Sequence, residues 1–206
     1  MKRIHYWMFS ILLVMISFSA GAQLLSHEEL IKQPVFRSLE SALQYPGKVY
    51  RLELKGTAVK DSLPEELFRL SDLQELSIRK CRLQKLNSSV GRLTRLQYLN
   101  LENNRLVDLP EALCSLSELH TLVINRNMIA CLPVNIGRLG KLERIDAWGN
   151  PMYLFPDGIT LLSDVLITVD LRQVGLRKDE IEQMERQLPK TEILYTQICD
   201  CKNGRR

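Results

Sequence analysis

The chain has 206 residues, and its 28 lysines and arginines nearly balance its 24 aspartates and glutamates, for a formal net charge of +4 at pH 7. Nucleic-acid binding needs a basic stripe rather than such a mixed surface, so nucleic acid is not an expected partner. After the first segment, no apolar run approaches the roughly 20 residues of a membrane span, so none is expected in the mature chain.

The N-terminal segment, residues 1–22, has the three parts of a secretory signal peptide. Lys2 and Arg3 form a basic start, Trp7–Phe18 is mostly apolar, and small residues end the segment at Ala22. This order is typical of a signal peptide that is cleaved after the small residues. We therefore expect export, to a secreted, periplasmic or cell-surface location.

Residues 23–48 are expected to form a helical N-terminal cap. Ser26 and Glu29 have the spacing of a capping box, and apolar residues then recur at helical spacing, namely Val35, Phe36, Leu39, Ala42 and Leu43. Pro46 and Gly47 end this segment. Such a cap would cover the apolar side and the unpaired edge of the first strand that follows.

The centre of the chain is a 23-residue repeat. Four regular copies begin at Leu73, Leu96, Leu119 and Leu142. Each begins Leu-x-x-Leu/Ile-x-Leu/Ile/Ala, and the two middle copies place Leu-Pro at Leu109-Pro110 and Leu132-Pro133. A fixed period of this length with this leucine pattern predicts a solenoid, in which stacked copies bury one another's apolar faces.

These residues resemble the leucine-rich repeat family, in the variant whose second half reads Leu-Pro-x-x-Leu/Ile-x-x-Leu. The resemblance covers residues 49–176, including an irregular first copy and an imperfect last strand at Leu166–Leu171. It implies an α/β solenoid with a curved parallel sheet of about six strands and helical caps at both ends. The convex side should hold extended or tight-turn structure rather than full helices. The fold does not name a ligand, because function must be argued from a site.

Position nine of the copies is expected to form a structural ladder of Cys81, Asn104, Asn127 and Asn150. An asparagine amide there can hydrogen-bond backbone groups of neighbouring turns. Loss of the amide should lower the free energy of unfolding by about 1–3 kcal/mol. The family accepts asparagine or cysteine at this position, so Cys81 is expected to be a buried thiol.

Residues 177–198 are expected to add a closing helix and a strand. Ile181, Met184 and Leu188 share one helical face before Pro189 ends the helix. Residues 199–206 form a polar tail.

The tail holds Cys199 and Cys201, which could pair with each other, pair with a partner or remain free. Two cysteines without nearby histidines make a poor metal site, so neither a metal nor a cofactor is expected.

Positions three, five and seven of each strand point away from the core and should line the concave face. Trp148 is the only tryptophan beyond residue 22, and its position directs it toward solvent. Exposed aromatic and arginine side chains dominate many binding surfaces. The predicted partner-binding residues are Tyr98, Thr121, Asn125, Arg126, Arg144, Asp146, Trp148 and Arg172. In the alternative, Trp148 folds over the turn at residues 149–151 and covers apolar surface.

An enzyme is not expected. Asp146 and Asp170 share a column on adjacent strands, near the roughly 5 Å spacing of a retaining glycosidase. However, Arg126, Arg144 and Arg172 are expected to neutralise both carboxylates, and an open sheet offers no enclosed pocket. The sequence also lacks nucleophile-elbow, phosphate-loop and zinc-protease motifs.

The sequence therefore predicts an exported binding module that recognises a protein or peptide on its concave face. One alternative is a glycan-binding module, because an exposed tryptophan beside aspartate and arginine also suits a sugar. Another is a self-assembling envelope protein that pairs through Cys199 and Cys201.

Overall fold

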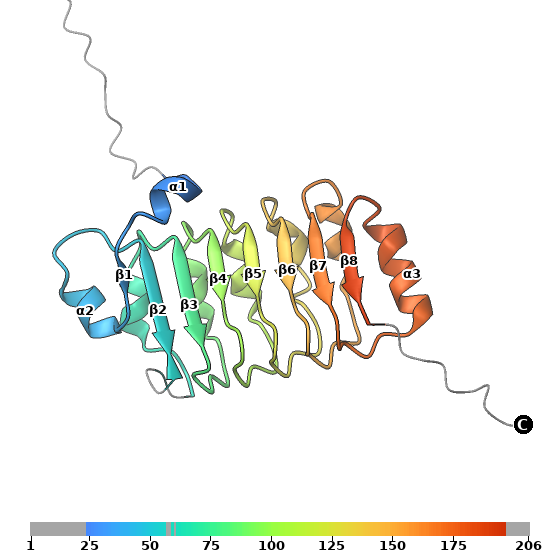
Figure 1. Ribbon diagram of the computed structural model, residues 1–206, viewed down its shortest axis with the longest axis horizontal. Coiled ribbons are helices and arrows are strands. Elements are labelled where there is room, and N and C mark those ends of the chain that lie inside the picture. The colour runs from blue at the N-terminus through green and yellow to red at the C-terminus, as the bar shows by residue number, and fades with distance from the viewer. Residues whose placement is uncertain (1–23, 57–58, 60, 197–206) are drawn as a thin grey trace, which may run out of the picture.

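A computed structural model describes residues 24–56, 59 and 61–196. The predicted signal peptide (1–22) and the tail (199–206), with Cys199 and Cys201, lie outside the described residues. Within the described part, one curved sheet runs the length of the molecule, with its strands side by side in chain order (Figure 1).

The sheet has eight parallel strands in the order β1 to β8 among the described residues. They are β1 (Val35–Phe36), β2 (Arg51–Lys55), β3 (Glu75–Arg79), β4 (Tyr98–Asn100), β5 (Thr121–Val123), β6 (Arg144–Asp146), β7 (Thr168–Leu171) and β8 (Glu192–Tyr195). The predicted α/β solenoid with a curved parallel sheet is confirmed. It has eight strands rather than about six because both cap segments each contribute one.

Short 3-10 helices follow the strands on the opposite side of the core (Figure 1). They are η2 (Glu65–Arg69), η3 (Ser88–Arg92), η4 (Glu111–Ser115), η5 (Ile136–Arg138) and η6 (Asp157–Leu162). Proline precedes three of them, at Pro64, Pro110 and Pro156, each with φ of −68°. Proline suits this site because its fixed φ starts a helical turn and its missing N–H needs no acceptor there. The tight turns expected on the convex side are therefore present.

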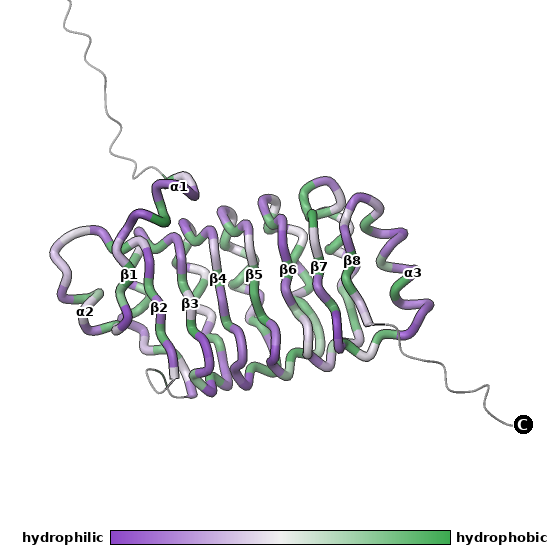
Figure 2. Tube along the Cα trace, viewed as in Figure 1, coloured by the Kyte–Doolittle hydropathy of each residue, from purple (hydrophilic) through white to green (hydrophobic). Residues whose placement is uncertain are grey.

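The core lies between the sheet and these turns. The leucines that begin the four regular copies are fully buried. Along the strands, hydrophobic and hydrophilic residues alternate, so one face of each strand is apolar (Figure 2). Each buried leucine contributes about 1.5–3 kcal/mol through removal of its side chain from water. No copy could bury these leucines alone, so the stacking of copies stabilises the fold.

Buried asparagines connect successive copies. The Asn127 side-chain oxygen accepts the Leu106 N–H at 3.1 Å, and its Nδ2 donates to the carbonyl oxygens of Leu101 and Ile124 at 2.9 and 2.8 Å. Asn104 and Asn150 make the equivalent bonds one copy earlier and later. In the first regular copy, the thiol of Cys81 lies 3.7 Å from the Leu54 carbonyl oxygen.

The N-terminal cap contains two short helices with a strand between them. In α1 (His27–Leu30), Ser26 and Glu29 form the expected capping box. The expected helical face through Val35 and Phe36 is wrong, because these residues pair with Arg51 and Leu52 as β1. Pro34 cannot continue a helix and disfavours helical backbone in the residue before it. The next helix, α2 (Leu39–Gln44), begins after the Ser38 cap.

The C-terminal cap consists of α3 (Lys178–Gln187) and β8. Ile181 and Met184 bury one face of α3, and β8 pairs with β7 in parallel. Among the described residues, every helix is too short or too polar to cross a bilayer.

Candidate functional site

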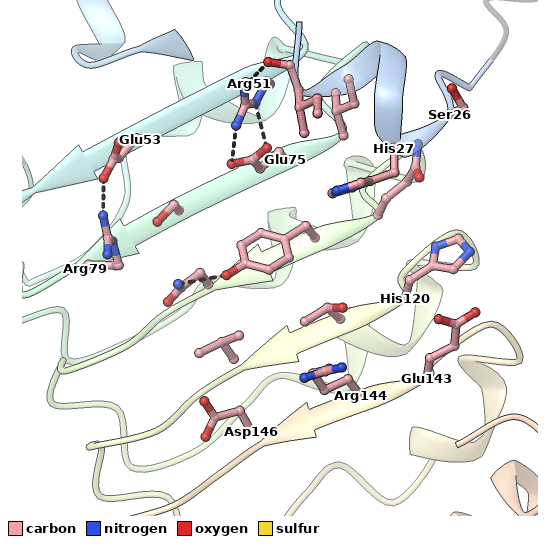
Figure 3. A pocket seen from close by; sticks show the side chains of 18 residues that line it. Ser26, His27, Arg51, Glu53, Glu75, Arg79, His120, Glu143, Arg144 and Asp146 are labelled. Atoms are coloured by element: carbon pink, nitrogen blue, oxygen red, sulfur yellow. Dashed lines mark hydrogen bonds and ion pairs between the residues drawn. The ribbon is translucent and has the colours of Figure 1, made fainter. Parts of the chain in front are cut away.

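An open groove of about 1040 Å³ lies between the concave face of the sheet and α1 (Figure 3). Side chains at positions three and five of β2 to β6 form its floor, and Leu30 of α1 and the following Ile31 lie along one side. His120 and Glu143 lie together where β5 and β6 begin. The sequence predicted a binding face here, but it did not predict that α1 would turn that face into a groove.

Hydrogen bonds hold both ends of α1 against the sheet. Leu25 N–H donates to the Gln74 side-chain oxygen at 2.9 Å, and Gln97 Nε2 donates to the Leu25 carbonyl oxygen at 2.9 Å. After the helix, Arg51 Nη1 donates to the Ile31 carbonyl oxygen at 3.1 Å. The helix is therefore fixed beside the beginnings of β2, β3 and β4.

The charged side chains in the N-terminal half of the groove neutralise one another. Arg51 Nε lies 2.6 Å from one carboxylate oxygen of Glu75, and its Nη2 lies 3.2 Å from the other. Glu53 pairs with Arg79, and the hydrogen bond from Arg79 lowers the pKa of Glu53. These four side chains already have partners of opposite charge within the chain.

The middle of the groove is less polar. Val123 is nearly buried, and half-buried Tyr98 accepts a hydrogen bond from Asn100 Nδ2 at 3.1 Å. Burial raises the pKa of Tyr98, so its phenol is neutral at pH 7 and its hydroxyl hydrogen is available to an acceptor. This part offers an aromatic ring and an aliphatic side chain to a ligand.

The C-terminal half contains two acceptor atoms that lack side-chain donors. Asn125 Nδ2 donates to Asp146 Oδ2 at 2.6 Å. Asp146 Oδ1 and Asn125 Oδ1 are buried and accept no hydrogen bond of ordinary geometry from the described residues. Burial raises the pKa of Asp146, although the hydrogen bond from Asn125 and the backbone N–H of Trp148 act on the carboxylate in the opposite direction. Exposed Arg144, on the same strand, has no ion-pair partner in the described part of the chain.

Asp170 lies opposite Asp146 on β7, as predicted, but its environment differs. Arg172 Nε lies 3.0 Å from Asp170 Oδ1, and Arg172 Nη2 lies 2.6 Å from Asp170 Oδ2. Burial alone would raise the pKa of Asp170, but the hydrogen bonds and charge of Arg172 outweigh it, so the net shift is downward. Arg172 thus forms the expected ion pair with Asp170, whereas Asp146 forms no ion pair among the described residues and is influenced by Arg172 only through its charge.

Trp148 lies at the end of β6 and contacts Arg126. The guanidinium carbon of Arg126 is 4.5 Å from the tryptophan ring centroid, within the range of a cation–π interaction. The Arg126 N–H also donates to the Trp148 carbonyl oxygen at 2.9 Å. The half-exposed indole therefore keeps part of its surface for a partner and uses part within the chain.

The eight predicted partner-binding residues fall into two groups. Tyr98, Thr121, Arg144 and Asp146 line the groove. The others, Asn125, Arg126, Trp148 and Arg172, follow the carboxyl ends of β5, β6 and β7.

Sequence reasoning missed several groove residues. It assigned no role to His27, His120, Gln97 or Glu143, but all four line the groove. The available signal was position two of the repeat, where polar residues recur at Gln74, Gln97, His120 and Glu143. Within the described ranges, no cluster of three or more histidine, cysteine or acidic side chains could hold a metal ion.

The period, parallel register and buried asparagines define a leucine-rich repeat solenoid. Residues 71–129 match the family model for the leucine rich repeat. The matched segment thus consists of leucine-rich repeats, and the described residues form a solenoid of this type; proteins built from such repeats are generally binding scaffolds. No curated protein sequence matches it.

Solved structures share the fold. A leucine-rich repeat protein of Leptospira interrogans is 26% identical, with a TM-score of 0.58, over 79% of this chain and 46% of that one. Internalin C2 of Listeria monocytogenes is 17% identical, with a TM-score of 0.58, over 78% of this chain and 66% of that one. The GASSHO1/SCHENGEN3 ectodomain of Arabidopsis thaliana is 22% identical, with a TM-score of 0.62, over 79% of this chain and 20% of that one. The chain thus spans less than half of the Leptospira protein.

Proposed function

We propose that this protein is an exported binding module that recognises a protein or peptide on its concave face. The observation that carries the proposal is the groove between α1 and the sheet, whose polar groups are not all paired within the chain. Tyr98, Thr121, Arg144 and Asp146 would contact the partner in the groove, and Trp148 would extend the contact at the strand ends.

The open shape of the groove supports a macromolecular partner. Its floor crosses β2 to β6, so an extended segment could contact several copies at once. Small-molecule sites usually bury most of the ligand in a cleft, whereas this groove is bounded on one side by a helix of four residues.

The comparisons support this class of function in general terms. The GASSHO1/SCHENGEN3 ectodomain was solved in complex with Casparian strip integrity factor 2. At 22% identity the likeness concerns the fold, so it names no partner for this chain. The compared structures give no support to the glycan alternative. Export rests on the signal-peptide pattern of residues 1–22.

The test is capture of partners by residues 23–206 from the native surface extract, with crosslinking and mass spectrometry. A Tyr98→Ala/Trp148→Ala variant, with folding checked by circular dichroism, is compared with the wild type. Loss of a partner in this variant alone supports recognition on the concave face. A second variant, Tyr153→Ala, removes an exposed aromatic ring outside the groove and should capture the same partners as the wild type. Identical captures by all three proteins would place the interaction elsewhere.

A further inference from the structure

We infer that the groove binds a cationic nitrogen group, an arginine or lysine side chain of the partner, at its β6 end, where Asp146 and the hydrogen-bonded Asn125 offer side-chain oxygens. This inference rests on the proposed function and specifies the chemistry that the partner presents.

The unpaired acceptors carry the inference. Asn125 is only 6% exposed, and its amide orientation is set because Nδ2 donates to Asp146 Oδ2. Its Oδ1 atom and the Asp146 Oδ1 atom are therefore acceptors; both are buried, and neither accepts a side-chain hydrogen bond from the described residues. Buried polar atoms in folded proteins nearly always have hydrogen-bond partners. Two side chains that hydrogen-bond each other, and each of which keeps an oxygen without a side-chain donor, indicate a place where a ligand supplies one.

The charges around this place favour a cation. Asp146 forms no ion pair with a described residue, and the in-register carboxylate of Asp170 adds negative potential, which the charge of Arg172 partly offsets. Two nearby arginines are engaged, because Arg172 holds Asp170 and Arg126 stacks on Trp148; exposed Arg144 lines the groove but forms no ion pair with Asp146. A guanidinium or ammonium group would supply donors and neutralise Asp146 together, which a neutral donor could not do.

The surroundings favour a basic side chain over a free inorganic cation. Val123 lies opposite Asp146 on β5, and the Tyr98 ring lies on the next strand of the same floor. Lysine and arginine bury their alkyl stems along apolar surface while the charged head reaches a polar group. An alkyl stem on Val123 and Tyr98 would bring the head to Asp146.

Titration of residues 23–206 with n-butylguanidinium tests this chemistry directly. The side-chain amide signals of Asn125 are followed by NMR, and neutral n-butylurea serves as the uncharged probe of nearly equal shape. Butylguanidinium should bind saturably and shift these signals, and butylurea should bind at least about tenfold more weakly. Equal binding of the two probes, or no saturable binding of butylguanidinium, would overturn the inference without the need for a variant.

A pair of charge variants locates the binding. Asp146→Asn keeps the side-chain size and should weaken butylguanidinium binding at least about tenfold. Asp164→Asn removes the same charge from an exposed carboxylate that pairs with Lys190 outside the groove, and should bind as the wild type does. Unchanged binding by Asp146→Asn would overturn the site.

A random peptide library separates this inference from the proposed function. Selection of peptides rich in arginine or lysine, with loss of binding to Asp146→Asn, supports both. Selected peptides that lack basic residues, or that bind Asp146→Asn equally, overturn the cation site and leave the binding function intact. If no peptide is selected, the peptide-binding function loses support, and the butylguanidinium titration still decides the cation site.

Discussion

The side-chain amide of Gln97 lies 2.9 Å from the carbonyl oxygen of Leu25, 72 residues earlier in the chain. The same amide lies 2.9 Å from the Gln74 side-chain oxygen, which also accepts the Leu25 N–H. The backbone of Leu25 is thus paired much as a strand residue would be, but with two glutamine side chains. This arrangement determines where α1 begins and therefore where the groove is bounded.

Replacement of Gln97 by alanine should release the start of α1. The change removes both hydrogen bonds of this amide and should lower the free energy of unfolding by about 1–2 kcal/mol. Faster amide hydrogen exchange in residues 24–33, measured by mass spectrometry, is the direct readout. Gln84→Ala is the control, because Gln84 bonds only an exposed aspartate side chain through its amide and lies away from α1. Equal exchange in both variants would contradict the role of Gln97.

Removal of the Asn127 amide should destabilise the whole solenoid. Asn127→Ala leaves the Leu106 N–H and the carbonyl oxygens of Leu101 and Ile124 without this partner in the core. We expect a loss of about 2–3 kcal/mol in urea denaturation. Asn135→Ala provides the comparison, since Asn135 is exposed and bonds Glu111 at the surface. Its effect should stay within about 0.5 kcal/mol, and similar losses would argue against the ladder.

Neutralisation of Asp146 and Asp170 should have opposite effects on stability. The folded-state pKa of Asp146 is raised by burial, so its charged form costs stability at neutral pH. Asp146→Asn should therefore raise the melting temperature at pH 7. This gain should shrink as the pH falls through the raised pKa and vanish below the ordinary value of 3.8.

For Asp170 the sign reverses, because its pKa is lowered overall and its charged form stabilises the fold above pH 3.8. Asp170→Asn should cost about 1 kcal/mol at pH 7, and the loss should disappear as the pH falls through the lowered pKa. Melting curves between pH 3 and pH 7 check both variants. Changes of the same sign at pH 7 would refute the different environments assigned to the two carboxylates.

Two substitutions at Arg126 separate its ring contact from its backbone conformation. Arg126 has a left-handed φ of 53° and stacks on Trp148. Alanine loses the stack, worth about 0.5–1 kcal/mol, and keeps the strained φ, whereas glycine adopts this φ freely. We expect Arg126→Gly to be more stable than Arg126→Ala by about 1 kcal/mol. Denaturation followed by Trp148 fluorescence measures both, and a less stable glycine variant would exclude this account.

The three described cysteines should react with iodoacetamide at different rates. Burial raises the pKa of Cys114 to about 11 and also raises that of Cys81, while Cys131 is partly exposed. Since the thiolate is the nucleophile, Cys131 should be alkylated first in the native chain at pH 8. Peptide mass spectrometry after short labelling ranks the three, and denatured protein should show similar rates for all. Faster labelling of Cys114 than of Cys131 would contradict the described burial.

The repeat period predicts the solenoid and the alignment of its strands. Because each regular copy has 23 residues, Tyr98, Thr121 and Arg144 fall in one register, and the structure pairs them so. Asp146 pairs with Asp170, which is 24 residues further on, because the last strand lies one residue beyond the strict period. Local periodicity is sufficient here because every strand pairs with its neighbours in the chain.

The position of α1 could not be predicted in this way. It depends on bonds between Leu25 and side chains 49 and 72 residues away, and the cap has no copy with which to compare it. The repeat pattern also does not predict which arginine forms an ion pair with which carboxylate. Arg126 lies near enough to the strand ends to suggest an ion pair, but it stacks on Trp148 instead.

The strand order β1 to β8 follows the chain without a crossover in the described part. A force applied to the two ends would therefore load the copies in series. The solenoid should peel from one end in steps of a single copy, because each copy is held only by its neighbours. Because of the same connectivity, one 23-residue unit could be inserted or deleted between copies while the copies on either side keep their contacts. The length of the groove can therefore change in evolution without a new fold.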